Sequence, residues 1–416
     1  MKPKTINAIS KIANQGDRVM NRRSLLLASG AAAVTSFAIG RAQAADTLNW
    51  SIHCDLTGPA AEGGKFQGDG FAAYAEWMNS KGGIRDRKIV ATVNDSTFKV
   101  DVAVANLKKA LAQGRVDYIF GESTGMIQAI SPENNATNKI LMTSGSFASE
   151  LADPQAYPYH FVPGATYGAQ LKMLVDYIKT SSGTAPAKIV FIHSSTAMGR
   201  DGMEDAVAYA KKLGIGVALV QQTKFVETDV SAFALAIRQA QPTHVIHHGY
   251  SLAVWPEIIR LVRDYGMDKV VFLGTIWQSE HAKVRDMKDV ADGLIGIRVW
   301  NDDATKPAGD MVKLMGEMMK KKDPKFNGIL RLGFIDAWIS AMMVTKATET
   351  VIDAGQPVNG DTLAAAMRSI KAWDTGGIVG APVNITNQQI GLGQVVKYAK
   401  ANNFEPQPVT PWVKAG

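Results

Sequence analysis

The feature that most constrains the fold is an alternation of short apolar runs with amphipathic segments, which begins at Leu48. The runs are rich in β-branched residues and span 48–56, 88–95, 117–122, 139–145, 188–194, 217–225, 244–249 and 269–275. Between them, apolar residues recur at helical spacing, as at Leu171, Leu174 and Ile178. Strand–helix alternation of this kind predicts an α/β fold with parallel sheets that are covered by helices on both faces.

The alternation occurs as two successive series, one before about residue 164 and the other up to about residue 294, and no flexible linker separates them. A mostly helical stretch follows, and after it come a passage rich in Gly and Pro and a hairpin-like end. The late helices must pack on one of the two sheets that these series are expected to form. The chain is therefore expected to cross between two lobes several times.

The positive charge of the chain is concentrated at its N-terminus. The formal net charge is +7, but residues 1–44 hold seven basic residues and one acid, whereas the remainder holds 38 basic and 37 acidic residues. The near-neutral remainder gives no reason to expect a nucleic-acid partner.

Residues 1–44 have the pattern of an export signal that is cleaved near Ala44. A basic stretch ends in Arg22-Arg23-Ser24, an apolar run follows at 25–40, and small residues precede Ala45. The arginine pair is typical of twin-arginine export, and an ordinary secretory signal is the alternative. The predicted location is periplasmic. Only Cys54 remains after cleavage, so no intramolecular disulfide can form.

A Gly-rich stretch follows the first apolar run and is expected to form a turn before a helix. Its glycines at 63, 64, 68 and 70 do not give G-x-G-x-x-G, and the chain contains no G-x-x-x-x-G-K-[ST]. The stretch therefore does not predict nucleotide binding, and no cofactor is expected. The glycines are interpreted as serving backbone geometry at the entry to the helix.

The ordered segments LTGP, GDGFAAYAEWMNSKGGI, VNDST, GES, LMTSGS, FIHSSTAMG, FVETDVSAFALAIRQAQPTHV and YGMDKVVFLG resemble the leucine/isoleucine/valine-binding family of periplasmic ABC-transporter proteins. The resemblance covers essentially all of the chain after the signal. It implies the type I periplasmic binding protein fold, two doubly wound lobes joined by three crossovers. Lobe 1 would comprise residues 46–161 plus 298–379, and lobe 2 residues 162–297 plus 380–416.

The same resemblance implies a function. The protein would be a monomeric binding protein and not an enzyme, it would close its lobes on a small molecule, and it would dock on an inner-membrane ABC permease. Two rival functions stay open. A sensor could use the same fold to report to a membrane receptor, and an exported enzyme on a dinucleotide fold would need the glycine fingerprint that the chain lacks.

Two Ser/Thr clusters follow predicted strands and precede helical segments. Hydroxyls and free N–H groups at such places bind carboxylates, although Ser and Thr there can also serve only as helix caps. With the resemblance, the predicted ligand contacts in lobe 1 are Ser123, Thr124, Ser144, Gly145, Ser146 and Phe147.

Three further contacts are predicted in lobe 2. Met198 stands where relatives commonly carry an aromatic residue that closes over the ligand, and Tyr250 and Trp277 lie at strand ends. In lobe 1, Glu62 occupies the turn where relatives often offer a ring to the ligand.

The sequence leaves open which acid, if any, would pair with an ammonium group of the ligand. Amino-acid-binding relatives carry an acid just after the strand at 269–275, but here the nearest acid is Glu280. Because an unpaired buried ammonium is costly, either Glu280 or Glu62 pairs with it, or the ligand has no amine. A small carboxylate such as an aromatic acid and a branched-chain amino acid therefore both remain open.

Three histidines near one strand end do not predict a metal site. On a strand, His244 and His248 share a face and His247 has the other, and no Cys or carboxylate cluster accompanies them. A hydrogen bond from His248 to an anionic ligand is conceivable.

Overall fold

The structure is a computed structural model that describes residues 47–249 and 254–414 of the chain. Residues 45–416 group into one unit, and the predicted export signal lies outside the described residues. Among the residues described, no helix is both long enough and apolar enough to span a bilayer.

The first series of apolar runs forms a parallel sheet with the strand order β2-β1-β3-β4-β5. β1 pairs in parallel with β2 on one side, where Leu48 lies opposite Ile89, and with β3 on the other, where Trp50 lies opposite Tyr118. The chain goes from β1 to β2 on one side of β1, and then returns to β3 on the other side. This reversal of strand order places a topological switch point between β1 and β3. The strands are β1 (Leu48–Cys54), β2 (Ile89–Asp95), β3 (Tyr118–Gly121), β4 (Leu141–Ser144) and β5 (His160–Phe161).

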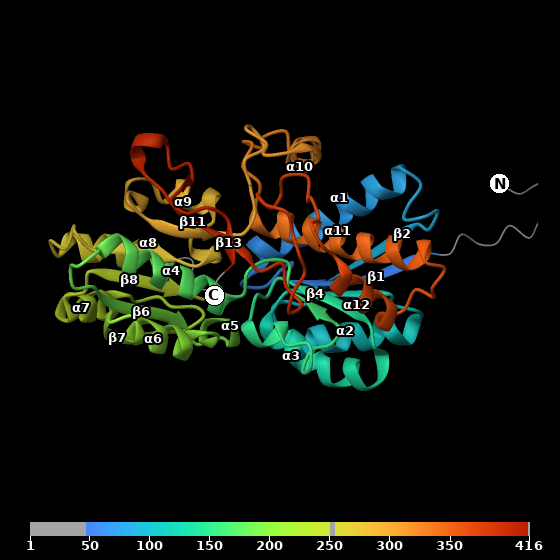
Figure 1. Cartoon of the computed structure of the whole chain (residues 1–416), viewed down its shortest axis with the longest axis horizontal. Helices are drawn as coiled ribbons and strands as arrows, with labels where there is room; N and C mark the ends of the chain where they lie inside the picture. The colour runs from blue at the N-terminus through green and yellow to red at the C-terminus, as the bar shows by residue number, and fades with distance from the viewer. Residues whose placement is uncertain (1–46, 250–253, 415–416) are drawn as a thin grey trace, which may run out of the picture. The chain divides into compact units, whose positions relative to one another are not determined.

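Helices cover both faces of this first sheet (Figure 1). Helix α1 lies beside α11, which comes from much later in the chain, and α12 packs against β4 and α11. Helices α2 and α3 pack together on the other face. The helices are α1 (Ala61–Ser80), α2 (Val100–Gln113), α3 (Thr124–Glu133), α11 (Leu332–Asp353) and α12 (Gly360–Ser369), with short turns η1 (Asn134–Asn138) and η2 (Ser149–Ala152).

The second series forms a second sheet, in the order β7-β6-β8-β9-β10-β11-β12, with β13 also paired to β11. Strands β6 to β10 are parallel and repeat the order of the first sheet, so a second switch point lies between β6 and β8. The strands are β6 (Lys188–Ser194), β7 (Gly216–Thr223), β8 (His244–His248), β9 (Val271–Gly274), β10 (Ile295–Arg298), β11 (Leu392–Lys397), β12 (Gln407–Pro408) and β13 (Val413–Lys414).

Strand β6 is buried on both faces. Ile189 and Phe191 join one apolar cluster, whereas Val190 and Ile192 join another that includes α7 and α8. Burial on both faces explains why these strands read as continuous apolar runs. The helices are α4 (Tyr167–Ser182), α5 (Ala197–Arg200), α6 (Met203–Lys212), α7 (Ser231–Ala240), α8 (Val254–Asp264), α9 (His281–Met287) and α10 (Asp310–Lys322), with turns η3 (Ile276–Gln278), η4 (Lys288–Ala291) and η5 (Lys400–Asn402).

The chain passes between the two sheets after β5, after β10 and before β11, and these three segments lie together. Val162 N–H donates to the Gln388 carbonyl at 2.8 Å, and Ile390 N–H donates to the Val162 carbonyl at 3.1 Å. Trp300 Nε1–H donates to the Pro163 carbonyl at 3.1 Å. The prediction of two doubly wound parallel-sheet lobes is confirmed, and the residues proposed as lobe boundaries stay a prediction.

The Gly-rich stretch is not a turn, contrary to the sequence-based expectation. Helix α1 begins at Ala61, so these glycines lie inside it. A Cβ on Gly64 would lie 2.1 Å from the Asp55 carbonyl oxygen, and one on Gly70 would lie 2.7 Å from the Phe334 carbonyl oxygen. The glycines therefore allow α1 to approach the end of β1 and helix α11 closely.

Candidate ligand-binding site

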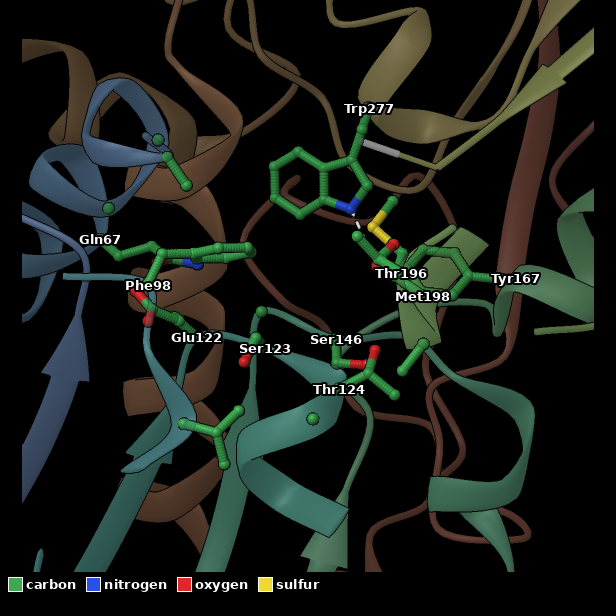
Figure 2. Close-up of a pocket in the computed structure, with 17 residues that line it drawn as sticks. Gln67, Phe98, Glu122, Ser123, Thr124, Ser146, Tyr167, Thr196, Met198 and Trp277 are labelled. Carbon is green, nitrogen blue, oxygen red and sulfur yellow. Dashed lines mark hydrogen bonds between the residues drawn. The ribbon is translucent and has the colours of Figure 1, made fainter. Parts of the chain in front are cut away.

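A cavity of about 200 Å³ lies where loops at the carboxyl ends of both sheets meet (Figure 2). Loops beside both switch points line it, which is where doubly wound sheets bind ligands. Pockets for drug-sized ligands typically measure roughly 300–1,000 Å³, so this cavity suits a small molecule. The lining residues are Ala60, Gly63, Gly64, Gln67, Phe98, Val100, Glu122, Ser123, Thr124, Gly125, Gly145, Ser146, Tyr167, Thr196, Ala197, Met198 and Trp277.

Hydroxyl groups and the start of α3 form one wall of the cavity. Ser123 caps α3, because its Oγ accepts from the Met126 N–H at 3.3 Å. Thr124 Oγ1 lies 2.6 Å from Ser146 Oγ, which joins the loops after β3 and β4. The N–H groups of Thr124 and Gly125 are the first two amides of α3 and have no acceptor within the helix. This wall therefore offers hydroxyls and a positive helix end to an anion.

Aromatic rings form much of the remaining surface. Trp277 Nε1–H donates to Tyr167 Oη at 2.9 Å, so the indole is fixed by a buried partner. In Figure 2, Phe98 and Glu122 stand on one side of the cavity, Tyr167 and Met198 on the other, and Trp277 above. These rings suit an apolar group of the ligand.

Phe98 is a lining residue that the sequence did not identify. It follows β2, and its φ of 57° is unusual for a bulky residue. Its ring stacks on Phe225, which follows β7 of the other sheet, with centroids 4.9 Å apart and planes 13° apart. Phe98 thus supplies a ring to the same cavity that Ala60, Gly63 and Gly64 line. Its position just after a strand was the only signal in the sequence.

Glu122 is another lining residue that the sequence did not single out, and it is the only acid among the described residues that line the cavity. Its Oε1 accepts a short hydrogen bond from the Ser96 hydroxyl, and its Oε2 is buried without a hydrogen-bond partner in the described part of the chain. Burial raises the pKa of Glu122 to about 8, and the negative charges of Asp55 and Asp95 raise it further. The Ser96 hydroxyl and the Asp55 N–H act in the opposite direction but do not offset the burial.

Two of the predicted residues lie behind the cavity wall. Ser144 is fully buried, and its Oγ lies 2.9 Å from His160 Nε2. Phe147 is also fully buried and packs against Tyr167 and Trp300, with centroids 5.7 Å and 5.6 Å away. Neither lines the cavity, whereas Ser123, Thr124, Gly145, Ser146, Met198 and Trp277 do.

Glu62 and Glu280 lie in an ion-pair network outside this cavity. Arg331 donates to Glu280 Oε1 through Nε at 2.7 Å and to Glu62 Oε1 through Nη2 at 2.7 Å. Lys283 Nζ lies 3.3 Å from Glu280 Oε2 and 3.7 Å from Glu62 Oε2. Glu62 lines a separate cavity, of about 620 Å³, which shares Trp277 with the first. Both acids thus already have cationic partners.

The remaining candidates are placed as follows. His248 Nδ1 lies 2.9 Å from Thr275 Oγ1, and its Nε2 lies 2.9 Å from the Met198 carbonyl oxygen. Both ring nitrogens of His248 therefore have partners within the protein. Tyr250 lies outside the described residues.

Two doubly wound sheets whose carboxyl ends line a shared cavity are the architecture of two-lobed α/β binding proteins. The family model described as "Periplasmic binding protein" matches residues 52–401. The chain belongs to the periplasmic binding protein family, whose members bind solutes and are not enzymes.

Individual relatives and solved structures agree with this assignment. The chain is 25% identical to the Leu/Ile/Val/Thr-binding protein of Salmonella typhimurium, over 67% of this chain and 75% of that protein. It is 29% identical to Leu/Ile/Val-binding protein homolog 1 of Brucella suis, over 58% of this chain and 64% of that protein.

Two solved structures share the fold. A branched-chain amino acid ABC transporter protein from Thermus thermophilus with bound valine aligns with a TM-score of 0.79 at 20% identity, covering 89% of this chain and 97% of that one. A solute-binding protein of an ABC transporter from Rhodopseudomonas palustris, in complex with 3,4-dihydroxybenzoic acid, aligns with a TM-score of 0.74 at 18% identity, covering 89% and 98%.

Proposed function

We propose that the protein is the solute-capturing component of an ABC importer and holds one small organic molecule between its two lobes. The observation that carries this proposal is the cavity itself, which loops at the carboxyl ends of both sheets line together. A ligand there contacts both lobes at once. It therefore stabilises the closed arrangement of the lobes by contacts that an open arrangement lacks.

The ligand is proposed to present a carboxylate to the wall formed by Ser123, Thr124 and Ser146. The hydroxyls and the first amides of α3 can satisfy a carboxylate without a cationic side chain. The two ligands named for the solved relatives, valine and 3,4-dihydroxybenzoic acid, are both small carboxylates. Phe98, Met198 and Trp277 would contact the apolar part of the ligand.

Lobe closure is proposed to occur about the three crossing segments. Val162 joins the segment after β5 to the one before β11 through Gln388 and Ile390, and Trp300 joins the segment after β10 to Pro163. Contacts between the lobes lie away from these segments. They include the stack of Phe98 on Phe225 and the ion pair of Glu62 with Lys283. In the closed form, the rims of both lobes would face an inner-membrane permease.

Export is part of the same proposal. The protein would be delivered to the periplasm by the signal at residues 1–44, through the twin-arginine route, and would act there as a monomer.

A thermal-shift screen tests the function directly. The panel comprises amino acids, aromatic acids, short carboxylates and amides such as urea, and calorimetry follows for each compound that stabilises the protein. A ligand at 100 times its Kd stabilises by about 2.7 kcal/mol, which is readily measured. The variants Thr124→Val and Ser146→Ala should weaken binding roughly tenfold each, because each loses a hydrogen bond to the ligand. Ser80→Ala, at the exposed far end of α1, is the control and should bind normally. No shift with any compound would refute the proposal.

A further inference from the structure

The cavity is unusual in its charge. Glu122 is its one acid, and its described lining contains no Lys, Arg or His. A ligand with only a carboxylate would therefore bring an anion beside a carboxyl group that is neutral only while it is protonated. The positive end of α3 is equivalent to about half an elementary charge, so it offsets only part of one negative charge.

The surroundings of Glu122 increase this imbalance. Asp55 follows β1, Asp95 ends β2, and Asp336 lies in α11, and all three act electrostatically on Cys54 together with Glu122. Asp55 and Asp95 are held by main-chain amides, from Ala60 at 2.6 Å and from Leu56 at 2.9 Å. Asp336 is fully buried and accepts from Gln67 Nε2 at 3.1 Å. Burial raises the pKa of Asp336 well above its ordinary value, so it adds no negative charge near pH 7. The negative charges of Asp55 and Asp95, which act on Glu122, therefore favour a cation beside it.

Glu122 is also incompletely satisfied, because its Oε2 is buried and accepts no hydrogen bond within the described residues. Buried carboxyl oxygens in folded proteins are nearly always hydrogen-bonded, because burial without a hydrogen-bond partner destabilises the folded state. The two acids that the sequence suggested for a ligand ammonium, Glu62 and Glu280, are bound to Arg331 and Lys283. Among the described acids, Glu122 alone lines the cavity, and its unpaired Oε2 lies beneath the cavity surface.

We propose that Glu122 pairs with a positively charged nitrogen of the ligand, which makes the ligand an amine-bearing carboxylate; this rests on the proposed function. Glu122 and Ser123 are adjacent at the end of β3. The amine and carboxylate of an α-amino acid are attached to one carbon, so the two neighbouring residues can engage both groups. The discriminating acid lies in lobe 1, not after β9, where amino-acid-binding relatives carry it.

The pairing couples binding to a proton. The pKa of Glu122 is about 8 in the free protein, because of burial first and Asp55 and Asp95 second, so the carboxyl is mostly protonated near pH 7. A bound ammonium favours the ionised form, and up to one proton leaves on binding. Affinity should rise as pH increases from 6 to 8, by up to about tenfold per unit, and should level off above that.

The test compares ligands that differ only in the amine. Calorimetry of the wild-type protein uses leucine against 4-methylpentanoate, and phenylalanine against 3-phenylpropanoate, in two buffers with different heats of protonation. In the pair whose amino acid binds more tightly, we expect that amino acid to bind roughly 10- to 100-fold more tightly than its deaminated analogue. Its binding should also release a proton. In Glu122→Gln, which copies the shape and the neutral charge of the protonated side chain, both the preference and the proton release should disappear.

Glu133→Gln is the matched control, because Glu133 ends α3, the helix that follows Glu122, and its side chain is 57% exposed beside Lys108. It should keep the preference, the proton release and the pH dependence. If a deaminated acid binds as tightly as its amino acid, or if Glu122→Gln leaves the preference intact, the role of Glu122 is refuted while the binding function stands. A protein that binds nothing in the wider screen would instead refute the proposed function, and this inference with it.

Discussion

Replacement of Glu280 by Gln tests the interpretation of the ion-pair network most sharply. Only 4% of the Glu280 side chain is exposed, and it accepts from Arg331 Nε at 2.7 Å and from the Leu332 N–H at 3.2 Å, with Lys283 3.3 Å away. Removal of one partner from a buried pair costs about 3–5 kcal/mol. Arg331 keeps Glu62 as a partner, so we expect the lower end, about 3 kcal/mol.

The expected change in melting temperature follows from the size of the unit. An unfolding entropy of about 2.1 cal/mol/K per residue gives about 0.8 kcal/mol/K for residues 45–416. Glu280→Gln should therefore lower the Tm by about 4 °C in scanning calorimetry at pH 7. The control is Glu257→Gln, which removes an exposed pair with Arg260, and it should leave the Tm unchanged within error.

The pH dependence provides a second check of the same variant. Burial raises the pKa of Glu280, but Lys283 and Arg331 lower it by more, and the resulting pKa lies below the ordinary value. Such a group stabilises the folded state above its unfolded pKa of about 4.3, and that contribution is lost as the pH falls through the folded pKa. The Tm difference between the wild type and Glu280→Gln should be full at pH 7 and should shrink below about pH 4. Equal melting temperatures at pH 7 would refute the idea that Glu280 is a structural acid. If Glu280→Gln lost the preference for an amino acid over its deaminated analogue, that result would also refute a purely structural role for Glu280.

Three other outcomes are expected. Phe98→Ala should weaken binding of the ligand found in the screen by roughly tenfold, because the variant loses both a cavity wall and the stack on Phe225; normal affinity by calorimetry would contradict this. Trp277→Phe, which keeps a ring but loses the hydrogen bond to Tyr167, should bind more weakly than the wild type yet more tightly than Trp277→Ala. Gly70→Ala should lower the urea midpoint, at a cost of roughly 1–3 kcal/mol, because its Cβ would meet α11, whereas Gly114→Ala has open space and should be neutral.

Much of the fold could be predicted because it is encoded locally. Runs such as 188–194 are apolar on both faces, and the segments between them repeat at helical spacing, so the order of strands and helices follows from the chain alone. The two Ser/Thr clusters were found for the same reason, since they directly follow strands. The Gly-rich stretch was misread as a turn, because the contacts that require Gly64 and Gly70 come from the end of β1 and from a helix far along the chain.

The sequence by itself determined the α/β class, the family, and which strand ends carry hydroxyls. Only the tertiary structure decided which side chains share the cavity. Phe98 and Glu122 came to light there, while Glu62 and Glu280 were found bound to Arg331, which precedes α11. The physical reason is that strand and helix patterns depend on neighbours a few residues away. The partner of a charge or a ring depends instead on how distant segments pack, and no local pattern records that packing.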